Sequence, residues 1–154
     1  FYDYQLRTPS KLNGSLAYVF GSAGLISFDY MYQNFRNTKL QPSSAFTVEN
    51  QDLSSSLRNT STFKVGTEWV FNIITLRGGY RLAQSPYKEA GDSFDLNGYS
   101  VGLGIRFSRN FGLDFAYDQS TFDDQYRFLD IPGVDAARLQ VTNSRFVSTL
   151  LFSF

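Results

Sequence analysis

Apolar and polar residues alternate along most of this chain, with a period of two residues. The clearest case is the stretch 97–107, whose apolar positions are Tyr99, Val101, Leu103, Ile105 and Phe107. Side chains of a strand point to opposite faces in turn, so this pattern predicts β-strands with one apolar and one polar face. The same pattern predicts strands over 11–20, 25–38, 60–71, 73–83, 97–107, 111–122 and 142–154. We therefore expect an all-β, antiparallel fold that spans residues 1–154 as one domain.

The connections between these strands alternate between short and long. Tight turns are expected at 21–24, at 72 and at 108–110, and long polar loops at 40–59, 84–96 and 123–141. Most of the predicted strands have roughly 10 to 13 residues, whereas soluble sheets favour about 5 to 6 and tilted membrane crossings about 9 to 11. Bacterial outer-membrane barrels combine short periplasmic turns with long outer loops. The pattern predicts a transmembrane β-barrel with the three long loops outside the cell.

Aromatic residues gather at both ends of the apolar face. Such rows are typical of the two interfaces of a bilayer, which favour Trp and Tyr. A lipocalin-like barrel would instead place its apolar face inside, and the last strand taken alone also fits the edge of a soluble sandwich. The aromatic positions near the short turns are Phe20, Trp69, Phe71, Phe107, Phe111 and Phe154, and those towards the other end are Tyr30, Tyr32, Tyr80, Tyr99 and Tyr117.

Charged residues occupy the opposite face of the predicted strands. Acidic and basic residues fall on neighbouring strands, so they either compensate one another or contact a ligand, and the sequence leaves both open. Four apolar residues of the same face, Met31, Phe35, Val70 and Leu151, could contact a ligand or pack against a plug. The predicted lumen-facing residues are Asp29, Lys64, Glu68, Arg77, Arg81, Arg106, Asp114, Asp118 and Arg145.

Composition excludes several classes of function. The 14 basic and 14 acidic residues cancel and no basic run occurs, so nothing favours a nucleic-acid partner. The chain has no cysteine and no histidine, so we expect no metal site of the usual zinc type and no other cofactor. Glu68, Asp114 and Asp118 could pair as carboxylates, but no nucleophile motif accompanies them, so an enzyme is not expected. The longest apolar run, 16–20, is too short for a spanning helix.

The last predicted strand ends on an aromatic residue, Phe154. In an outer-membrane barrel this strand pairs with the first and keeps its lipid face apolar up to the interface. Phe154 is therefore predicted to anchor the strand and, by likeness to other outer-membrane proteins, to be the assembly signal read by the barrel-assembly machinery. Seven crossings are an odd number, whereas a complete bacterial barrel has an even one. The chain is thus expected to be part of a larger barrel whose N-terminal part, with any signal peptide, is absent from this sequence.

Several runs resemble the FadL/TodX (OmpP1) family of outer-membrane transporters, in the form found in Bacteroidetes. They are YQLRTPSKLNGSLAY at 4–18, GLISFDY at 24–30, LRGGY at 76–80 with SPYK at 85–88, and LDFAY at 113–117.

The resemblance implies the C-terminal half, about seven strands, of a 14-stranded barrel in the bacterial outer membrane. It also implies passive uptake of hydrophobic compounds, such as long-chain fatty acids or aromatic hydrocarbons, past an N-terminal hatch. The implied partners are membrane lipid, a hydrophobic ligand and other outer-membrane proteins. A structural or partner-binding barrel subunit of a larger surface or secretion complex is the alternative. The hatch and gate belong to the N-terminal half of the family, and the substrate cannot be deduced from these residues.

Overall fold

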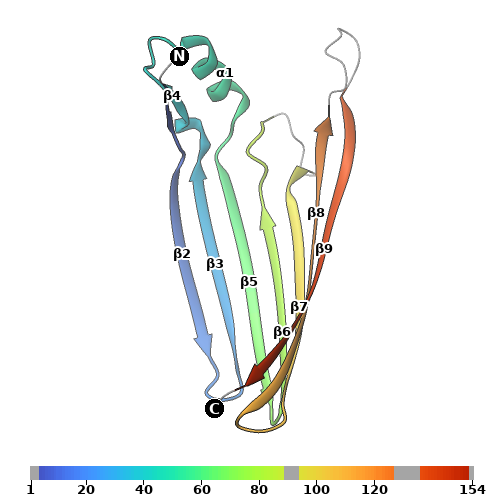
Figure 1. Cartoon of the computed structure of the whole chain (residues 1–154). Helices are drawn as coiled ribbons and strands as arrows, with labels where there is room; N and C mark the ends of the chain where they lie inside the picture. Colours follow the sequence, from blue (N-terminus) through green and yellow to red (C-terminus); the bar gives the residue numbers. More distant parts are fainter. Residues whose placement is uncertain (1–3, 89–93, 127–135, 153–154) are drawn as a thin grey trace.

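A single antiparallel sheet of seven strands makes up most of the molecule (Figure 1). The computed structural model describes residues 4–88, 94–126 and 136–152. All neighbours in the sheet are antiparallel, and the strand order is β2-β3-β5-β6-β7-β8-β9. This confirms the predicted all-β fold. The strands are β2 (Ser10–Val19), β3 (Gly24–Asn34), β5 (Thr60–Phe71), β6 (Ile74–Ala83), β7 (Leu96–Arg106), β8 (Phe111–Tyr126) and β9 (Ala137–Phe152).

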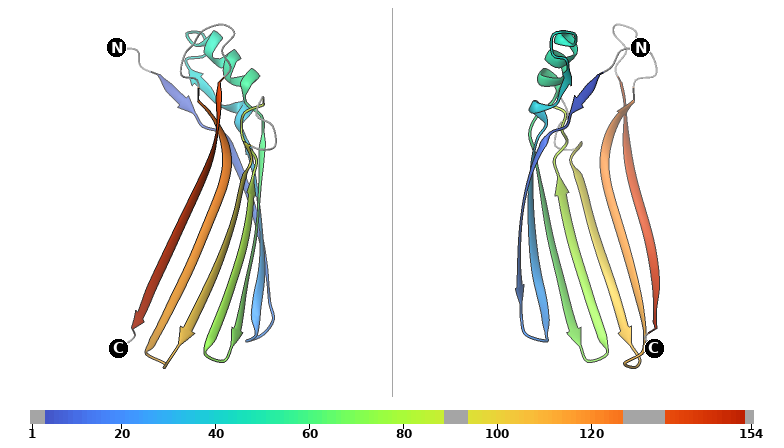
Figure 2. Two further views of the ribbon diagram at one scale, coloured as in Figure 1. Left: turned by 90° about the vertical axis from the view of Figure 1, so that its right-hand side faces the viewer. Right: turned by 60° about the vertical axis from the view of Figure 1, so that its left-hand side comes forward.

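The sheet is curved and open (Figure 2). Within the described residues, β2 and β9 are its two edges, and neither pairs with the other. The side chains of β2 are exposed along the whole strand, and those of β9 along most of it. Closure into a barrel is therefore not seen, although the curvature leaves a concave and a convex face.

The predicted tight turns are present at one end of the sheet. Phe20 donates its backbone N–H to the Gly24 carbonyl at 2.8 Å, and Phe107 donates to the Phe111 carbonyl at 3.1 Å. Asn72 has φ of 54°, in the left-handed region that a two-residue hairpin turn requires and that asparagine tolerates. These turns hold neighbouring strands in register, so side chains of one face lie in rows across the sheet.

The opposite end of the sheet carries more structure than the predicted loops. A short second sheet pairs β1 (Gln5–Arg7) with β4 (Lys39–Gln41), after the 3-10 helix η1 (Phe35–Asn37). The expected long loop over 40–59 contains helix α1 (Thr47–Ser56), so that prediction was wrong. Asn50 fixes the helix to β4, since its side chain bonds the N–H and the carbonyl of Leu40 at 2.7 and 3.0 Å. None of the residues of α1 is buried, so no apolar stripe reveals it in the sequence.

The loop predicted over 123–141 is also shorter than expected. Strand β8 continues to Tyr126 and β9 begins at Ala137, while the intervening 127–135 lies outside the described residues. Polar pairs extend this ladder: the Thr121 and Thr142 hydroxyls lie 3.3 Å apart, and Arg138 bonds the Asp123 carboxylate. The apolar residues change face here, from Phe115 and Tyr117 on one face to Phe122 and Tyr126 on the other, so no single alternation runs through the whole strand.

The sheet has no conventional core. Among the described residues, no large side chain is fully buried. Large apolar side chains stay exposed instead: Val101 is 55% exposed and Phe28 is 43% exposed on central strands of the sheet. Soluble antiparallel sheets normally cover their apolar face with a second layer. No helix in the described part of the chain is long and apolar enough to cross a membrane.

Candidate functional site: two belts of charged residues

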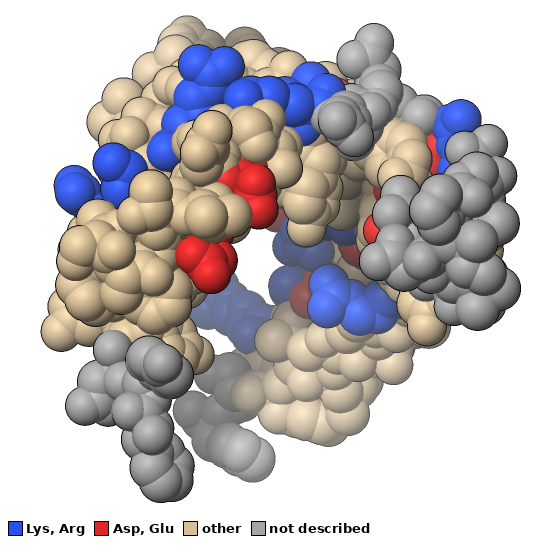
Figure 3. Space-filling view, turned by 90° about the horizontal axis from the view of Figure 1, so that it is seen from above, with Lys and Arg blue, Asp and Glu red and all other residues tan. Residues whose placement is uncertain are grey.

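Strand register brings the predicted charged residues to one face. Lys64 lies opposite Asp29 on one side and Arg81 on the other, Glu68 lies opposite Arg77, and Asp118 lies opposite Arg145. Seen from the α1 end, acidic and basic side chains gather around the hollow of the curved sheet (Figure 3). The residues form two rows, which we call the turn-side belt (Glu68, Arg77, Arg106, Asp114) and the loop-side belt (Asp29, Lys64, Arg81, Asp118, Arg145).

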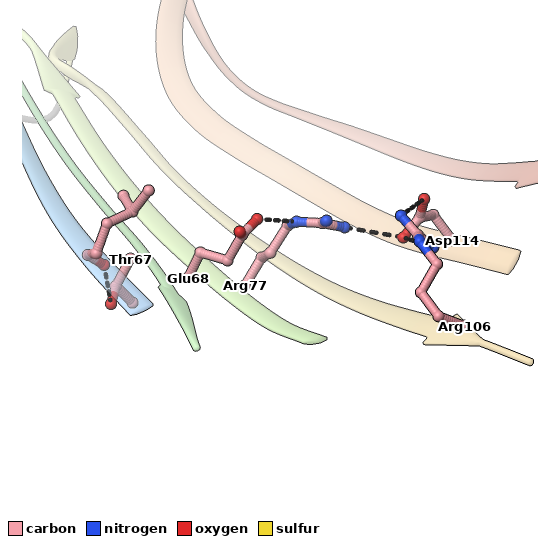
Figure 4. Close-up of polar contacts among 6 residues, drawn as sticks. Thr67, Glu68, Arg77, Arg106 and Asp114 are labelled. Atoms are coloured by element: carbon pink, nitrogen blue, oxygen red, sulfur yellow. Dashed lines mark hydrogen bonds and ion pairs between the residues drawn. The ribbon is translucent and has the colours of Figure 1, made fainter. Parts of the chain in front are cut away.

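The turn-side belt is a continuous network (Figure 4). Arg77 donates through Nε to Glu68 Oε2 at 2.6 Å and through Nη1 to Asp114 Oδ1 at 3.0 Å. Arg106 then donates through Nη2 to Asp114 Oδ2 at 3.2 Å. The alternating charges cross strands β5, β6, β7 and β8, and each of the four has a partner. Such compensation is what charges on a partly enclosed wall require.

Glycines make room for the arginine side chains of both belts. Three of the four arginines lie over a glycine on the neighbouring strand: Arg81 over Gly98, Arg77 over Gly102 and Arg106 over Gly112. A Cβ at Gly98 would lie 2.7 Å from Arg81 Nε, and one at Gly112 would lie 2.8 Å from Arg106 Cδ. Arg77 and Arg81 can therefore cross β7 to reach acids on β8.

The loop-side belt is only partly paired. Arg81 makes a bidentate pair with Asp118, with Nη1 to Oδ2 at 2.9 Å and Nη2 to Oδ1 at 3.0 Å. Arg145 lies opposite Asp118 in the register, and its positive charge attracts the Asp118 carboxylate. The side chains of Asp29 and Lys64 form no hydrogen bond or ion pair with any residue that the structure describes.

A niche separates the two belts on the concave face. Its floor is a row of small residues on adjacent strands, Ser27, Gly66, Gly79 and Ser100, which are successive register partners. The niche is an open hollow of about 360 Å³, lined by charged residues of both belts. The sequence shows the two serines and two glycines singly, but only the register reveals that they form one row.

A second polar cluster, which the sequence did not reveal, joins two loops at the α1 end. Arg58 donates through Nε to the Ser85 carbonyl at 2.8 Å and through Nη2 to Asp95 Oδ1 at 3.1 Å. The backbone N–H of Ser85 donates to the same Asp95 oxygen at 2.8 Å, and Asp95 is only 8% exposed. Arg58 and Asp95 are 37 residues apart in segments predicted as loops, so no periodic signal links them.

The other predicted candidates are not brought together into a site. Met31 lies on β3, Phe35 in η1, Val70 on β5 and Leu151 on β9, so they form no single apolar patch. Glu68 and Asp114 are bridged by Arg77 instead of forming a carboxylate pair, and no group of three possible metal ligands occurs in the described part of the chain. Phe154, the predicted assembly signal, lies outside the described residues.

The convex face carries two aromatic rows with aliphatic residues between them. Towards the α1 end, tyrosine hydroxyls donate to polar side chains: Tyr80 to Asn97 at 2.9 Å and Tyr99 to Gln119 at 2.9 Å. Near the short turns the rings contact one another. The ring pairs there are Tyr18 with Phe20 at 4.8 Å, Phe20 with Trp69 at 5.4 Å, Phe107 with Phe111 at 5.4 Å and Phe111 with Phe152 at 5.2 Å between centroids.

Comparison of the chain with models of protein families, with curated proteins and with solved structures found no match.

Proposed function

We propose that this chain is part of a transmembrane β-barrel of the bacterial outer membrane, with its convex face against lipid and its concave face lining the lumen. The observation that carries the proposal is the contrast between the two faces of one sheet layer. The convex face exposes aliphatic residues between two aromatic rows, whereas the concave face holds the charged belts. A bilayer accounts for the first face and a water-filled lumen for the second.

The height of the apolar face fits this proposal. The apolar face runs from Tyr99 on β7 to Phe107, the residue after this strand, which at about 3.3 Å per residue gives roughly 26 Å. A strand tilt of about 40° reduces this to about 20 Å, close to the apolar band of roughly 25 Å on outer-membrane barrels. Tyrosine hydroxyls that donate to Asn97 and Gln119 mark one border of the band. Amphipathic rings of this kind favour the membrane interface.

The direction of the two edge strands restricts how such a barrel could close. Six antiparallel pairings separate β2 from β9, so these two strands run in the same direction. Pairing β9 directly with β2 would create a parallel ladder, whereas bacterial barrels are antiparallel throughout. A second copy of the chain, related by a twofold axis parallel to the strands, would place its β2 beside β9 of the first copy, and this contact would again be parallel. Antiparallel closure therefore needs an odd number of further strands, and seven would complete the 14-stranded barrel that the family resemblance implies.

Within this barrel, we propose passive uptake of hydrophobic compounds, such as long-chain fatty acids or aromatic hydrocarbons. The resemblance at 4–18, 24–30, 76–80, 85–88 and 113–117 supports this step. The polar concave wall fits a water-filled vestibule, so apolar contacts for the ligand would come from other parts of the barrel. Passive uptake of this kind requires no cofactor, and neither does a partner-binding barrel.

Uptake by intact cells tests the proposal. Cells with and without the gene should differ in the initial rate of uptake of a labelled long-chain fatty acid or aromatic hydrocarbon. Epitope tags at residue 50 and residue 22 should be labelled from outside only at residue 50, and the protein should show heat-modifiable migration. A heat-modifiable barrel that gives no uptake and purifies with a stoichiometric protein would favour the partner-binding alternative. Equal labelling of both tags would contradict the orientation.

A further inference from the structure

The loop-side belt places two cations directly opposite each other. Lys64 on β5 and Arg81 on β6 are register partners on the concave face. Like charges at opposed positions of a sheet destabilise it unless something compensates them. Arg81 is compensated because its guanidinium crosses Gly98 and binds both oxygens of Asp118. Lys64 keeps its three N–H donors unused towards the described residues, so its positive charge remains available at the border of the niche, beside the equally unpaired carboxylate of Asp29.

Two serine hydroxyl groups lie close to the two glycines of the niche floor, beside this cation. A Cβ built on Gly66 would lie 2.8 Å from Ser27 Oγ, and one on Gly79 would lie 2.6 Å from Ser100 Oγ. Ser27 donates only a long bond of 3.5 Å to the Gly66 carbonyl, and Ser100 Oγ has no hydrogen-bond partner in the described part of the chain. Both hydroxyls can therefore donate towards a group lying over the two glycines.

The charges around the niche select the sign of that group. The niche is lined by three cations, Lys64, Arg77 and Arg81, against two carboxylates, Asp29 and Glu68. On the other side of the niche, Arg77 is already occupied by Glu68 and Asp114. A cationic solute in the niche would be repelled by this excess of positive charge, whereas an oxyanion would accept a charge-assisted hydrogen bond from Lys64.

We propose that this niche is a binding site for the oxyanion group of a small solute, a carboxylate or a phosphate-type group. Lys64 is its principal binding residue, and the Ser27 and Ser100 hydroxyls are supporting donors. A volume of about 360 Å³ is at the lower end of ligand pockets and accommodates one such group with a small body attached. The inference rests on the proposed function only in that the concave face must be open to solute.

Calorimetry on the whole protein in detergent micelles tests the site with benzoate, phenylphosphonate and the neutral benzyl alcohol. Lys64→Gln should weaken binding of the oxyanions about tenfold, as expected for one charge-assisted hydrogen bond. Lys64→Arg should retain most of the affinity, and Asp29→Asn should raise it a fewfold by removing a competing carboxylate. Lys11→Gln, on edge strand β2, removes the same charge away from the niche and should change nothing.

Protection of Lys64 in the unmodified protein gives a readout that does not depend on how a variant folds. Benzoate or phenylphosphonate should slow acylation of Lys64, measured by mass spectrometry, more than that of Lys11. Binding of both probes supports a general oxyanion site, and binding of one identifies it as carboxylate-type or phosphate-type. Equal weakening by Lys64→Gln and Lys11→Gln, or benzyl alcohol binding as tightly as benzoate, would overturn the site. A barrel that binds the probes but transports nothing would refute only the proposed uptake.

Discussion

The two belts on the concave face use the same residue types, yet one is a closed network and the other is not. In the turn-side belt, each charge has a partner on a neighbouring element, with Arg77 at the centre. In the loop-side belt, only Arg81 and Asp118 form an ion pair, and Lys64 and Asp29 are left without one among the described residues. A fully compensated belt serves the stability of the wall, whereas uncompensated charges are available to a solute.

Geometry explains why the belts differ. Arginines reach acids two strands away because the strand between them offers a glycine, as Gly102 does for Arg77. Lys64 has Asp29 opposite it on β3 but forms no ion pair with it, and its partner on the other side is a second cation, Arg81. Glycines of β7 therefore allow the long arginine bridges to β8, and Lys64 makes no bridge of this kind.

The largest expected effect tests which face of the sheet contacts lipid. The difference in pairing between the two belts matters to a solute only if the concave face is exposed to water. Leu103 lies on the convex face of β7, next to Gly102 on the concave face. Leu103→Arg should lower the free energy of unfolding by about 2 to 4 kcal/mol if the residue lies near the bilayer midplane. Unfolding of the whole protein in lipid vesicles measures it.

Gly102→Ser is the matched control for this substitution, since it adds a small polar group to the charged face. We expect a smaller loss than for Leu103→Arg, limited to the crowding of Arg77. Gly102→Arg would add a charge to the same wall and compete with Arg77 for Asp114. If Gly102→Arg blocked membrane insertion and Leu103→Arg were neutral, the assignment of the two faces would be reversed.

The second prediction tests the closed belt through its central residue. Arg77→Met removes the bridge between Glu68 and Asp114 and leaves Glu68 without an ion pair among the described residues. The loss should be about 1 to 2 kcal/mol, below that of a buried pair because Arg77 is 38% exposed. Arg145→Met, in the loop-side belt, should cost less because Arg145 makes no hydrogen bond with a described residue. Equal losses would mean that the belts do not differ in pairing.

Alternation of apolar residues was enough to predict all seven strands of the sheet and the turns at 21–24, 72 and 108–110. It also placed the nine charged residues on one face, because a period of two fixes the direction of each side chain. It could not show that Arg77 binds Glu68 and Asp114 at once, since this depends on register across four strands. Helix α1 has no buried stripe, and the apolar residues at the loop-side ends of β8 and β9 lie on the opposite face from those near the turns. One continuous alternation therefore did not reveal them.

The third prediction tests the role of glycine in arginine bridging. Gly98→Ala would place a Cβ 2.7 Å from Arg81 Nε and displace the arginine from Asp118. We expect a loss of about 1 kcal/mol, typical of a small overpacking that also weakens an ion pair. Gly14→Ala on β2 is the matched control, because nothing lies within 4 Å of its added Cβ. Equal effects at both positions, measured by equilibrium unfolding, would show that backbone propensity dominates.

The smallest expected effect is at the unpaired end of the loop-side belt. Lys64→Met removes a charge that faces Arg81 and has no ion-pair partner among the described residues. The free energy of unfolding should change by less than about 0.5 kcal/mol in low salt, with a slight gain in stability if repulsion from Arg81 outweighs attraction to Asp29. Added salt should reduce this gain, because partly exposed charges are screened. A loss comparable to that of Arg77→Met would show that Lys64 has a stabilising partner, and the two belts would then be equivalent.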